Sequence, residues 1–325
     1  MNKAIKFISL VIVFTFFSCS FNIKEEKSLN EKLDKYEYII KNDTFVAKIQ
    51  DSLPGDFIKL NNGITYYELA NKSSSGPVLV LIHGFSVPSY IWEPTYQKAK
   101  NLGYKVLRFD LYGRGYSENP DTDYTDELFA KQSWELLDSL SINKAVLIGL
   151  SNGGRVISKM AHIDSSRIDK MIYVSSNGFN DVTELNDKTV SEDEILNYIN
   201  NYEFLSQSQK NDFKNPEQYK DWGKRYSELQ KYKGFAKALI STRKNHVSLD
   251  NIHIYIAKTG IDVFTLWGGY DTVIVFDDFE SKLNHILPDR EEFFFKSAGH
   301  LPQMESPKEF NTVLFENILD FTKKK

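Results

Sequence analysis

The chain has 325 residues, of which 41% are hydrophobic and 14% aromatic, and its formal net charge is −4 at pH 7. This composition is typical of a globular protein with one large core carrying an insertion, or with two domains. The negative charge argues against a nucleic-acid-binding protein, and a single cysteine excludes a disulfide within the chain.

The first 18 residues have the pattern of a signal peptide. Lys3 and Lys6 precede an apolar or small run over 7–18 that is too short for a comfortable membrane span. The run ends at Ser18, directly before Cys19, the only cysteine. A small residue before a lone cysteine resembles the lipobox of bacterial lipoproteins. That resemblance implies cleavage before Cys19, a lipid on Cys19, and an exported protein anchored to a membrane outside the cytoplasm; a secreted protein or an uncleaved anchor is the alternative.

Residues 19–54 are largely polar and rich in Lys and Glu. Within them Leu29, Leu33, Tyr36 and Ile40 recur at helical spacing, which predicts a tether that contains a helix.

From residue 55 onward, apolar runs and amphipathic stretches alternate. Residues 56–70 predict a β-hairpin that turns at Asn62-Gly63. Further strands are predicted over residues 77–82, 105–109, 145–149, 171–174, 261–267 and 291–295, and helices over 91–102, 125–140 and after Ser151. Repeated strand–helix units predict a mostly parallel sheet that is covered on both faces.

The alternation of predicted strands and helices stops over residues 179–258. This charged stretch is predicted to be helical and to lack strands. The economical interpretation is a helical insertion between two strands of one sheet, placed as a lid over the site. A separate small domain is the alternative.

A short motif marks the centre of the chain. Gly149-Leu150-Ser151-Asn152-Gly153 fits the G-x-S-x-G pattern of a nucleophile elbow, with a predicted strand before it and an amphipathic helix after it. In such an elbow small residues let the backbone fold sharply and leave the serine at the tip. A glycine turn with an incidental serine is the alternative.

Five segments in a fixed order, each at the end of a predicted strand, carry a family resemblance: His83-Gly84-Phe85, residues 109–117, residues 149–154, residues 267–271 and residues 298–300. With them the chain resembles the α/β-hydrolase fold family over residues 55–325. The resemblance implies an eight-stranded, mostly parallel sheet with helices on both faces and an inserted helical lid. The expected organisation is a signal peptide (1–18), a tether (19–54), a first core part (55–178), the lid (179–258) and a second core part (259–325).

The resemblance also implies a catalytic triad in the order serine, acid, histidine. A serine hydroxyl needs a base to take its proton, and a histidine held by a carboxylate suits that task. We therefore assign Ser151 as nucleophile, His300 as general base and then acid, and Asp271 as the carboxylate that orients His300. The resemblance places the oxyanion donors on the backbone N–H groups of Phe85 and Asn152.

Other candidates are given structural parts. Three histidines lack the small-residue turn that precedes His300 and are expected at the surface or in packing: His246, His253 and His285. His162 lies on the helix predicted after the elbow. His83 lies in the oxyanion-loop motif, where the resemblance makes it structural, and Asp110 is expected to brace a turn.

The expected activity is that of a serine hydrolase acting on carboxylic esters, of the esterase or lipase type, through an acyl-Ser151 intermediate. Serine at the elbow argues against dehalogenases and epoxide hydrolases, which use aspartate there. A carbon–carbon bond hydrolase, a cofactor-free perhydrolase and a non-catalytic surface lipoprotein that binds a ligand are the alternatives. Four aromatic residues of the lid either line an acyl pocket or form the core of the lid: Tyr219, Trp222, Tyr226 and Phe235.

No metal, nucleotide or other cofactor is expected. The chain has one cysteine, no paired histidines at ligand spacing and no glycine-rich phosphate loop after a strand. The expected partners are a small ester or lipid substrate and, through Cys19, a membrane.

Overall fold

The computed structural model describes residues 30–319. Its centre is one eight-stranded sheet in the order β1-β2-β4-β3-β5-β6-β7-β8. The β1–β2 and β2–β4 pairs are antiparallel, and all other neighbours are parallel. The predicted mostly parallel, eight-stranded sheet is therefore confirmed. The strands are β1 (Asp56–Leu60), β2 (Gly63–Ala70), β3 (Val78–Ile82), β4 (Val106–Phe109), β5 (Ala145–Leu150), β6 (Ile168–Val174), β7 (Asp262–Gly268) and β8 (Glu291–Phe295).

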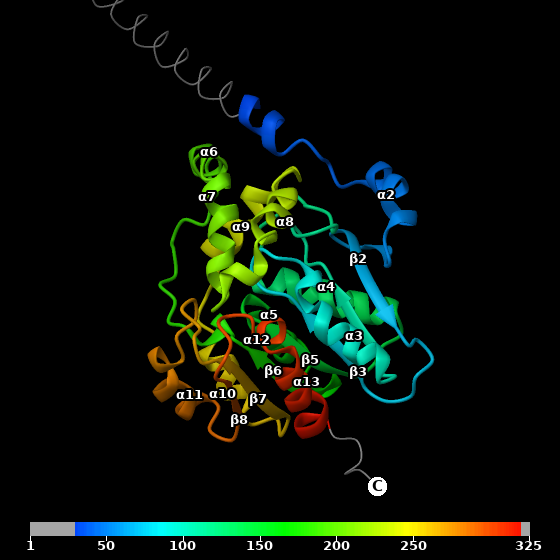
Figure 1. Cartoon of the computed structure of the whole chain (residues 1–325), viewed down its shortest axis with the longest axis vertical. Helices are drawn as coiled ribbons and strands as arrows, with labels where there is room; N and C mark the ends of the chain where they lie inside the picture. Colours follow the sequence, from blue (N-terminus) through cyan, green and yellow to red (C-terminus); the bar gives the residue numbers. More distant parts are fainter. Residues whose placement is uncertain (1–29, 320–325) are drawn as a thin grey trace, which may run out of the picture.

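Helices cover both faces of this sheet (Figure 1). One buried cluster joins the sheet to α4, α5, α10 and α11, and a second joins it to α3, α13 and the helices α6 to α9. Apolar strands buried on both faces need such cover, because an uncovered face would leave them in water. The helices are α2 (Asp43–Ile49), α3 (Glu93–Asn101), α4 (Asp126–Ser139), α5 (Asn152–Ile163), α6 (Glu192–Asn200), α7 (Tyr202–Ser208), α8 (Trp222–Leu229), α9 (Phe235–Lys244), α10 (Asp250–Ile256), α11 (Glu280–Ile286), α12 (Pro302–Glu305) and α13 (Pro307–Thr312).

The hairpin of β1 and β2 turns one residue earlier than predicted. Leu60 pairs with Gly63, so the turn consists of Asn61 and Asn62. A distant segment holds this register: the Ile64 N–H donates to the Glu118 carboxylate, and the Glu118 N–H donates to the Ile64 carbonyl, both over 2.8 Å. Because these residues are far apart in the chain, the local sequence pattern cannot predict their contact or the register that it holds.

The helices α6 to α10 lie between β6 and β7, and no strand of the sheet falls in that stretch. Figure 1 shows α6 to α9 gathered together on one side of the sheet. By contrast α10 packs against α5 and α11 and so belongs to the layer that covers the sheet, although its residues lie inside the range predicted for the lid.

Residues 36–45, here called the N-terminal strap, pack on the domain. Ile39 forms a parallel bridge with Tyr232, between α8 and α9, and Phe45 packs edge-on against the Tyr232 ring. Figure 1 shows this blue segment running past α8 and α9. The tether predicted over 19–54 is therefore attached to the domain in the part that the structure describes.

Two buried charges fix the strap. The Glu37 carboxylate is 2% exposed and accepts hydrogen bonds from the Gly234 and Ala236 N–H groups and from the Tyr202 hydroxyl. Lys41 is 5% exposed, and its ammonium group donates to the Gly115 carbonyl over 2.9 Å. Burial of a charge is costly unless it is hydrogen-bonded, so these bonds are what makes the strap's placement specific.

The signal peptide predicted over 1–18 and Cys19 lie outside the described residues. Within residues 30–319, no helix has the length and apolar character needed to cross a bilayer.

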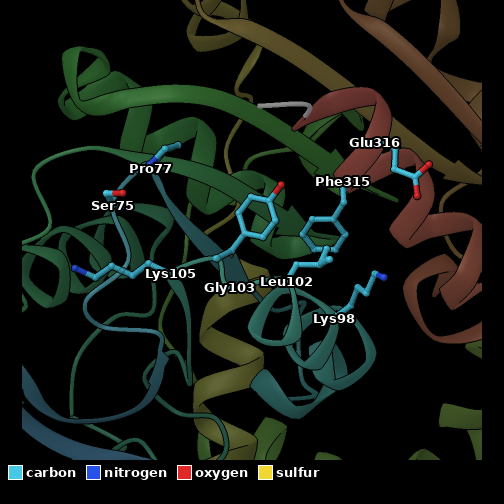
Figure 2. A pocket seen from close by; sticks show the side chains of 10 residues that line it. Ser75, Pro77, Lys98, Leu102, Gly103, Lys105, Phe315 and Glu316 are labelled. Carbon is cyan, nitrogen blue, oxygen red and sulfur yellow. The ribbon is translucent and has the colours of Figure 1, made fainter. Parts of the chain in front are cut away.

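A cavity of about 540 Å³ opens where β3 and β4 begin (Figure 2). Its lining includes Pro77 and Lys105, each directly before a strand, and Phe315 from the C-terminal segment. Since β3 and β4 run parallel to β5, this cavity lies at the opposite end of the sheet from Ser151.

Candidate active site

The predicted site residues follow the carboxyl ends of parallel strands. Phe85 lies just beyond β3, Ser151 directly after β5, Asp271 just beyond β7 and His300 in the loop after β8. Parallel strands end at one edge of the sheet, and that edge is where open α/β sheets bind ligands.

Ser151 connects β5 to α5 in a strained conformation. Its φ is 51° and its ψ −117°, a backbone region that non-glycine residues seldom adopt. The turn is so tight that a Cβ on Gly149 would lie 2.4 Å from the Gly153 carbonyl oxygen. The predicted strand–turn–helix context of the motif is thus present. Ser151 is 9% exposed, and within residues 30–319 its hydroxyl makes no hydrogen bond, so it is available to a ligand.

Asp271 and His300 form a hydrogen-bonded pair. The His300 Nδ1 lies 2.8 Å from the Asp271 Oδ2. The other carboxylate oxygen accepts from the Val273 and Ile274 N–H groups, each over 2.8 Å, which fixes the carboxylate in place. A carboxylate can only accept, so Nδ1 carries the proton and Nε2 is left free to accept one.

The charge state of His300 reflects two opposing effects. Burial by itself lowers the pKa of His300, but the charge and hydrogen bond of Asp271, with a further contribution from Asp212, raise it above the usual range. In the described part of the chain, the Ser151 hydroxyl and the His300 Nε2 are not hydrogen-bonded to each other. The structure therefore joins His300 to Asp271 directly and places Ser151 at the same edge of the sheet.

The two predicted oxyanion residues flank Ser151. A Cβ on Gly84 would lie 3.3 Å from the Ser151 Cβ, so the loop after β3 packs against the serine. The Phe85 carbonyl accepts a hydrogen bond from the Arg114 Nε over 2.8 Å, and this bond fixes the loop after β3. In the described residues the N–H groups of Phe85 and Asn152 donate to no protein acceptor.

His83 supports the same loop, as expected. Its Nε2 accepts from the Leu111 N–H over 2.9 Å, and its Nδ1 donates to the Gly84 carbonyl. Burial lowers the pKa of His83 to about 3, so the ring stays neutral. Asp110 accepts from the backbone N–H groups of Ser89 and Tyr116, and this contact braces the turn after β4.

His246 reaches the site, although its sequence context predicts only a surface or packing position. Its Nε2 lies 2.9 Å from the side-chain oxygen of Asn152, the residue after Ser151. Burial, then the charges of Arg155, Arg243 and Arg114, lower the pKa of His246 to about 3. The ring is therefore neutral and donates from Nε2 to Asn152. The two residues are 94 positions apart, and no local signal connects them.

Asp212 is a second functional candidate that sequence reasoning missed. It ends a 3₁₀ turn between α7 and α8 (Gln209–Asp212), and its carbonyl accepts from the His300 N–H over 2.8 Å. Burial raises the pKa of Asp212 to about 6. The charge of His300 acts in the opposite direction and lowers this pKa, whereas the negative charge of Asp271 raises it. A lone aspartate in a charged helical stretch gives no sequence signal of this position.

The four aromatic residues noted in the lid pack mainly with one another and their neighbours. Trp222, Tyr226 and Phe235 are buried in the second hydrophobic cluster, and Tyr219 is partly buried against it. Tyr226 packs edge-on against Phe235, and Trp222 packs against Tyr219. Trp222 also packs edge-on against Tyr90, and the Tyr226 hydroxyl is hydrogen-bonded to Ser86, so these side chains form both the core of the insertion and its contact with the loop after β3.

Within residues 30–319 no three His, Cys, Asp or Glu side chains are grouped so that they could hold a metal ion.

The alpha/beta hydrolase fold family matches residues 77–307 of the chain. The chain belongs to that family. An uncharacterized protein of Mycobacterium tuberculosis is 33% identical over 106 residues, which are 33% of this chain and 31% of the relative. The match thus spans about a third of that relative's length.

Solved structures of other alpha/beta hydrolases share the fold. A meta-cleavage product hydrolase from Pseudomonas fluorescens IP01 superposes with a TM-score of 0.66 and 21% identity, covering 81% of this chain and 96% of that one. A thermophilic esterase from Thermogutta terrifontis has a TM-score of 0.65 and 19% identity, covering 81% and 97%. At these identities the likeness concerns the fold.

Proposed function

We propose that this alpha/beta hydrolase is a serine hydrolase of carboxylic esters. The observation that carries the proposal is the combination of a strained, unpartnered Ser151 with a His300–Asp271 pair at the same edge of the sheet. A histidine whose Nδ1 is held by a carboxylate has its Nε2 free for the serine proton.

The reaction proceeds in two halves. The Ser151 Oγ attacks the ester carbonyl carbon while His300 Nε2 takes the hydroxyl proton, and the N–H groups of Phe85 and Asn152 bind the oxygen that becomes negative. The tetrahedral intermediate collapses, the bond to the alcohol breaks, and His300 gives its proton to the leaving oxygen. A water then loses a proton to His300 and attacks the acyl-serine, which releases the acid and restores Ser151.

A carbon–carbon bond hydrolase is the second candidate, because a solved meta-cleavage product hydrolase shares the fold with a TM-score of 0.66. The same three side chains would serve it. The esterase from Thermogutta terrifontis is an equally similar fold neighbour with the preferred chemistry in its name.

The test is hydrolysis of p-nitrophenyl esters of increasing acyl length by the wild type and by Ser151→Ala. Wild-type turnover that disappears in Ser151→Ala supports the proposal, and the preferred chain length separates an esterase from a lipase. Ser166→Ala is the matched control, since Ser166 is exposed and bonds only to Asp164. Wild-type rates no higher than those of Ser151→Ala on every ester would move carbon–carbon cleavage, or ligand binding without catalysis, to the front.

We also propose that the protein is exported and anchored through a lipid on Cys19. The support is the sequence pattern of 1–19 alone. Stable anchoring needs more than one acyl chain, which lipoprotein modification would provide. Metabolic labelling with radioactive palmitate is expected to mark the wild type in the membrane fraction and to miss Cys19→Ser; equal labelling of both would refute this anchor.

A further inference from the structure

A second cavity, of about 600 Å³, lies between the start of the described chain and the helices α7 and α8. Four lysines line it: Lys35, Lys220, Lys224 and Lys231. They come from the helical turn ahead of the strap and from α8 and its two flanks, so only the fold brings them to one surface. None of the three proposed catalytic residues lines this cavity, which is therefore separate from the active site.

The lining of this cavity carries an excess of positive charge. Among the described residues that form it, Glu203 alone is acidic. Within residues 30–319 Lys35 and Lys224 form no salt bridge, and the Lys35 ammonium group lies over the ring of its neighbour Tyr36, 4.9 Å from the centroid. Both ammonium groups are therefore available to an anion.

The other two lysines have acidic neighbours outside the cavity. Lys231 is paired with Glu228 over 2.6 Å. Lys220 lies 4.0 Å from Glu217, and both of these side chains are more than three-quarters exposed. An exposed ion pair of this length contributes little, so Lys220 adds to the free positive charge and Lys231 does not.

Exposed apolar side chains border the lysines. Tyr38 lines the cavity and is 55% exposed, and Ile40, on the same strap, is 57% exposed. The strap presents these two side chains to solvent because it buries Glu37 and Lys41 instead. Tyrosine and lysine together are typical of the membrane–water interface, where the ring enters the headgroup layer and the ammonium groups meet lipid phosphates.

The same surface is where the chain enters the domain. Figure 1 shows the first helical turn, in blue, at the end of the molecule that carries α6, α7 and α8. With the lipid anchor proposed above, the chain from Cys19 to Asn30 spans at most about 40 Å, at ~3.6 Å per residue when fully extended. The entry side is thus the side that the anchor keeps closest to the bilayer.

We propose that this cavity, with Tyr38 and Ile40 at its border, is a docking surface for a bilayer that contains anionic phospholipids. Lys35, Lys220 and Lys224 bind the lipid phosphates, and the two apolar side chains enter the headgroup layer. The choice of a bilayer as the occupant rests on the proposed anchor, whereas the basic cavity is a feature of the fold alone. Docking turns the helical insertion toward the membrane.

The test is sedimentation with sucrose-loaded vesicles of phosphatidylcholine, alone or in an equal mixture with phosphatidylglycerol. The parent chain is residues 19–325 with Cys19→Ser, which lacks the lipid and keeps all of the packing described within residues 30–319. It is expected to bind the mixed vesicles and not the neutral ones. A triple variant is expected to lower the partition coefficient on the order of 100-fold, since each lysine at an anionic surface contributes about fivefold. Its changes are Lys35→Gln, Lys220→Gln and Lys224→Gln.

The control makes the same change of net charge at exposed positions on β1, α3 and α4, namely Lys59→Gln, Lys100→Gln and Lys131→Gln. It is expected to bind as the parent chain does. Equal loss in the two triple variants overturns the inference, and so does equal binding of the parent chain to both kinds of vesicle. Binding of the parent chain to heparin but to neither vesicle also overturns it, and assigns the lysines to a soluble polyanion.

The anchor and the docking surface are told apart because this assay contains no lipidated protein. Palmitate on Cys19 without vesicle binding by the parent chain leaves the anchor in place and refutes the docking surface. Vesicle binding without palmitate on Cys19 refutes the anchor and keeps the docking surface as a peripheral membrane contact.

Discussion

The imidazole Nε2 of His246 lies 2.9 Å from the side-chain oxygen of Asn152, next to the serine at the elbow. This contact ties the residue that follows the proposed nucleophile to the segment between α9 and α10. The hydrogen bond fixes the side chain of Asn152, at the start of α5, within the site.

Replacing His246 with alanine leaves the Asn152 side chain without its donor and free to rotate beside Ser151. We expect kcat/KM for p-nitrophenyl esters to fall about tenfold, because a lost hydrogen bond to a buried polar group costs on that order. His285→Ala, at an exposed position on α11, is the control. An unchanged kcat/KM and acyl-length profile would mean that the contact only packs the segment.

Asp271→Asn keeps an oxygen for the Val273 and Ile274 N–H groups but presents an NH₂ group to His300 Nδ1. The histidine must then adopt the other tautomer, with its proton on Nε2, where it cannot take the serine proton. We expect kcat to fall about 10⁴-fold with little change in melting temperature. Asp277→Asn, on an exposed turn, serves for comparison. A loss of less than tenfold would remove Asp271 from the triad.

The acid limb of the rate profile is expected above the ordinary pKa of histidine. Burial opposes protonation of His300, but Asp271 and Asp212 together raise its pKa. The base must be neutral to accept the serine proton, so kcat/KM declines as the pH falls through this raised pKa. In Asp212→Asn the limb moves toward lower pH, because one negative charge beside the imidazolium is lost. A limb that stays at the wild-type position in this variant would contradict the electrostatic coupling.

Glu37→Ala is expected to destabilise the protein by about 3 kcal/mol, since it leaves several buried donors unpaired. Those donors are the N–H groups of Gly234 and Ala236, at the start of α9, and the Tyr202 hydroxyl. Urea unfolding measures the change. Asp34→Ala, an exposed position just ahead of the strap, is expected to change little. Equal stability of the two variants would show that the strap contributes nothing to the fold.

Lys41 predicts a pH dependence of stability with a definite sign. Burial lowers its pKa to about 7 in the folded protein, whereas an unfolded lysine titrates near ~10.4. Between these values the unfolded chain binds more protons, so the free energy of unfolding of the wild type, taken relative to Lys41→Met, rises with pH by about 1.4 kcal/mol per unit. Urea titrations of both proteins across this window measure it. A difference that is flat or falls with pH would contradict the buried placement of the Lys41 ammonium group.

The sequence determined the features that depend on neighbouring residues. Runs such as residues 145–150 are apolar enough to form strands buried on both faces, and the glycines around Ser151 allow a turn that larger residues would block. Because these strands are parallel, their carboxyl ends share one edge, and the order of motifs along the chain was enough to predict that Asp271 and His300 meet.

Only the tertiary structure decided which distant polar residues enter the site and the strap. His246 and Asp212 reach the site from helical stretches in which the local sequence pattern indicates only amphipathic helices. In the strap, Glu37 is buried against residues almost 200 positions away in the chain. The physical reason is that hydrogen bonds and the burial of a charge depend on which groups packing brings close together. The spacing of these groups along the chain does not indicate that they will be close in the fold.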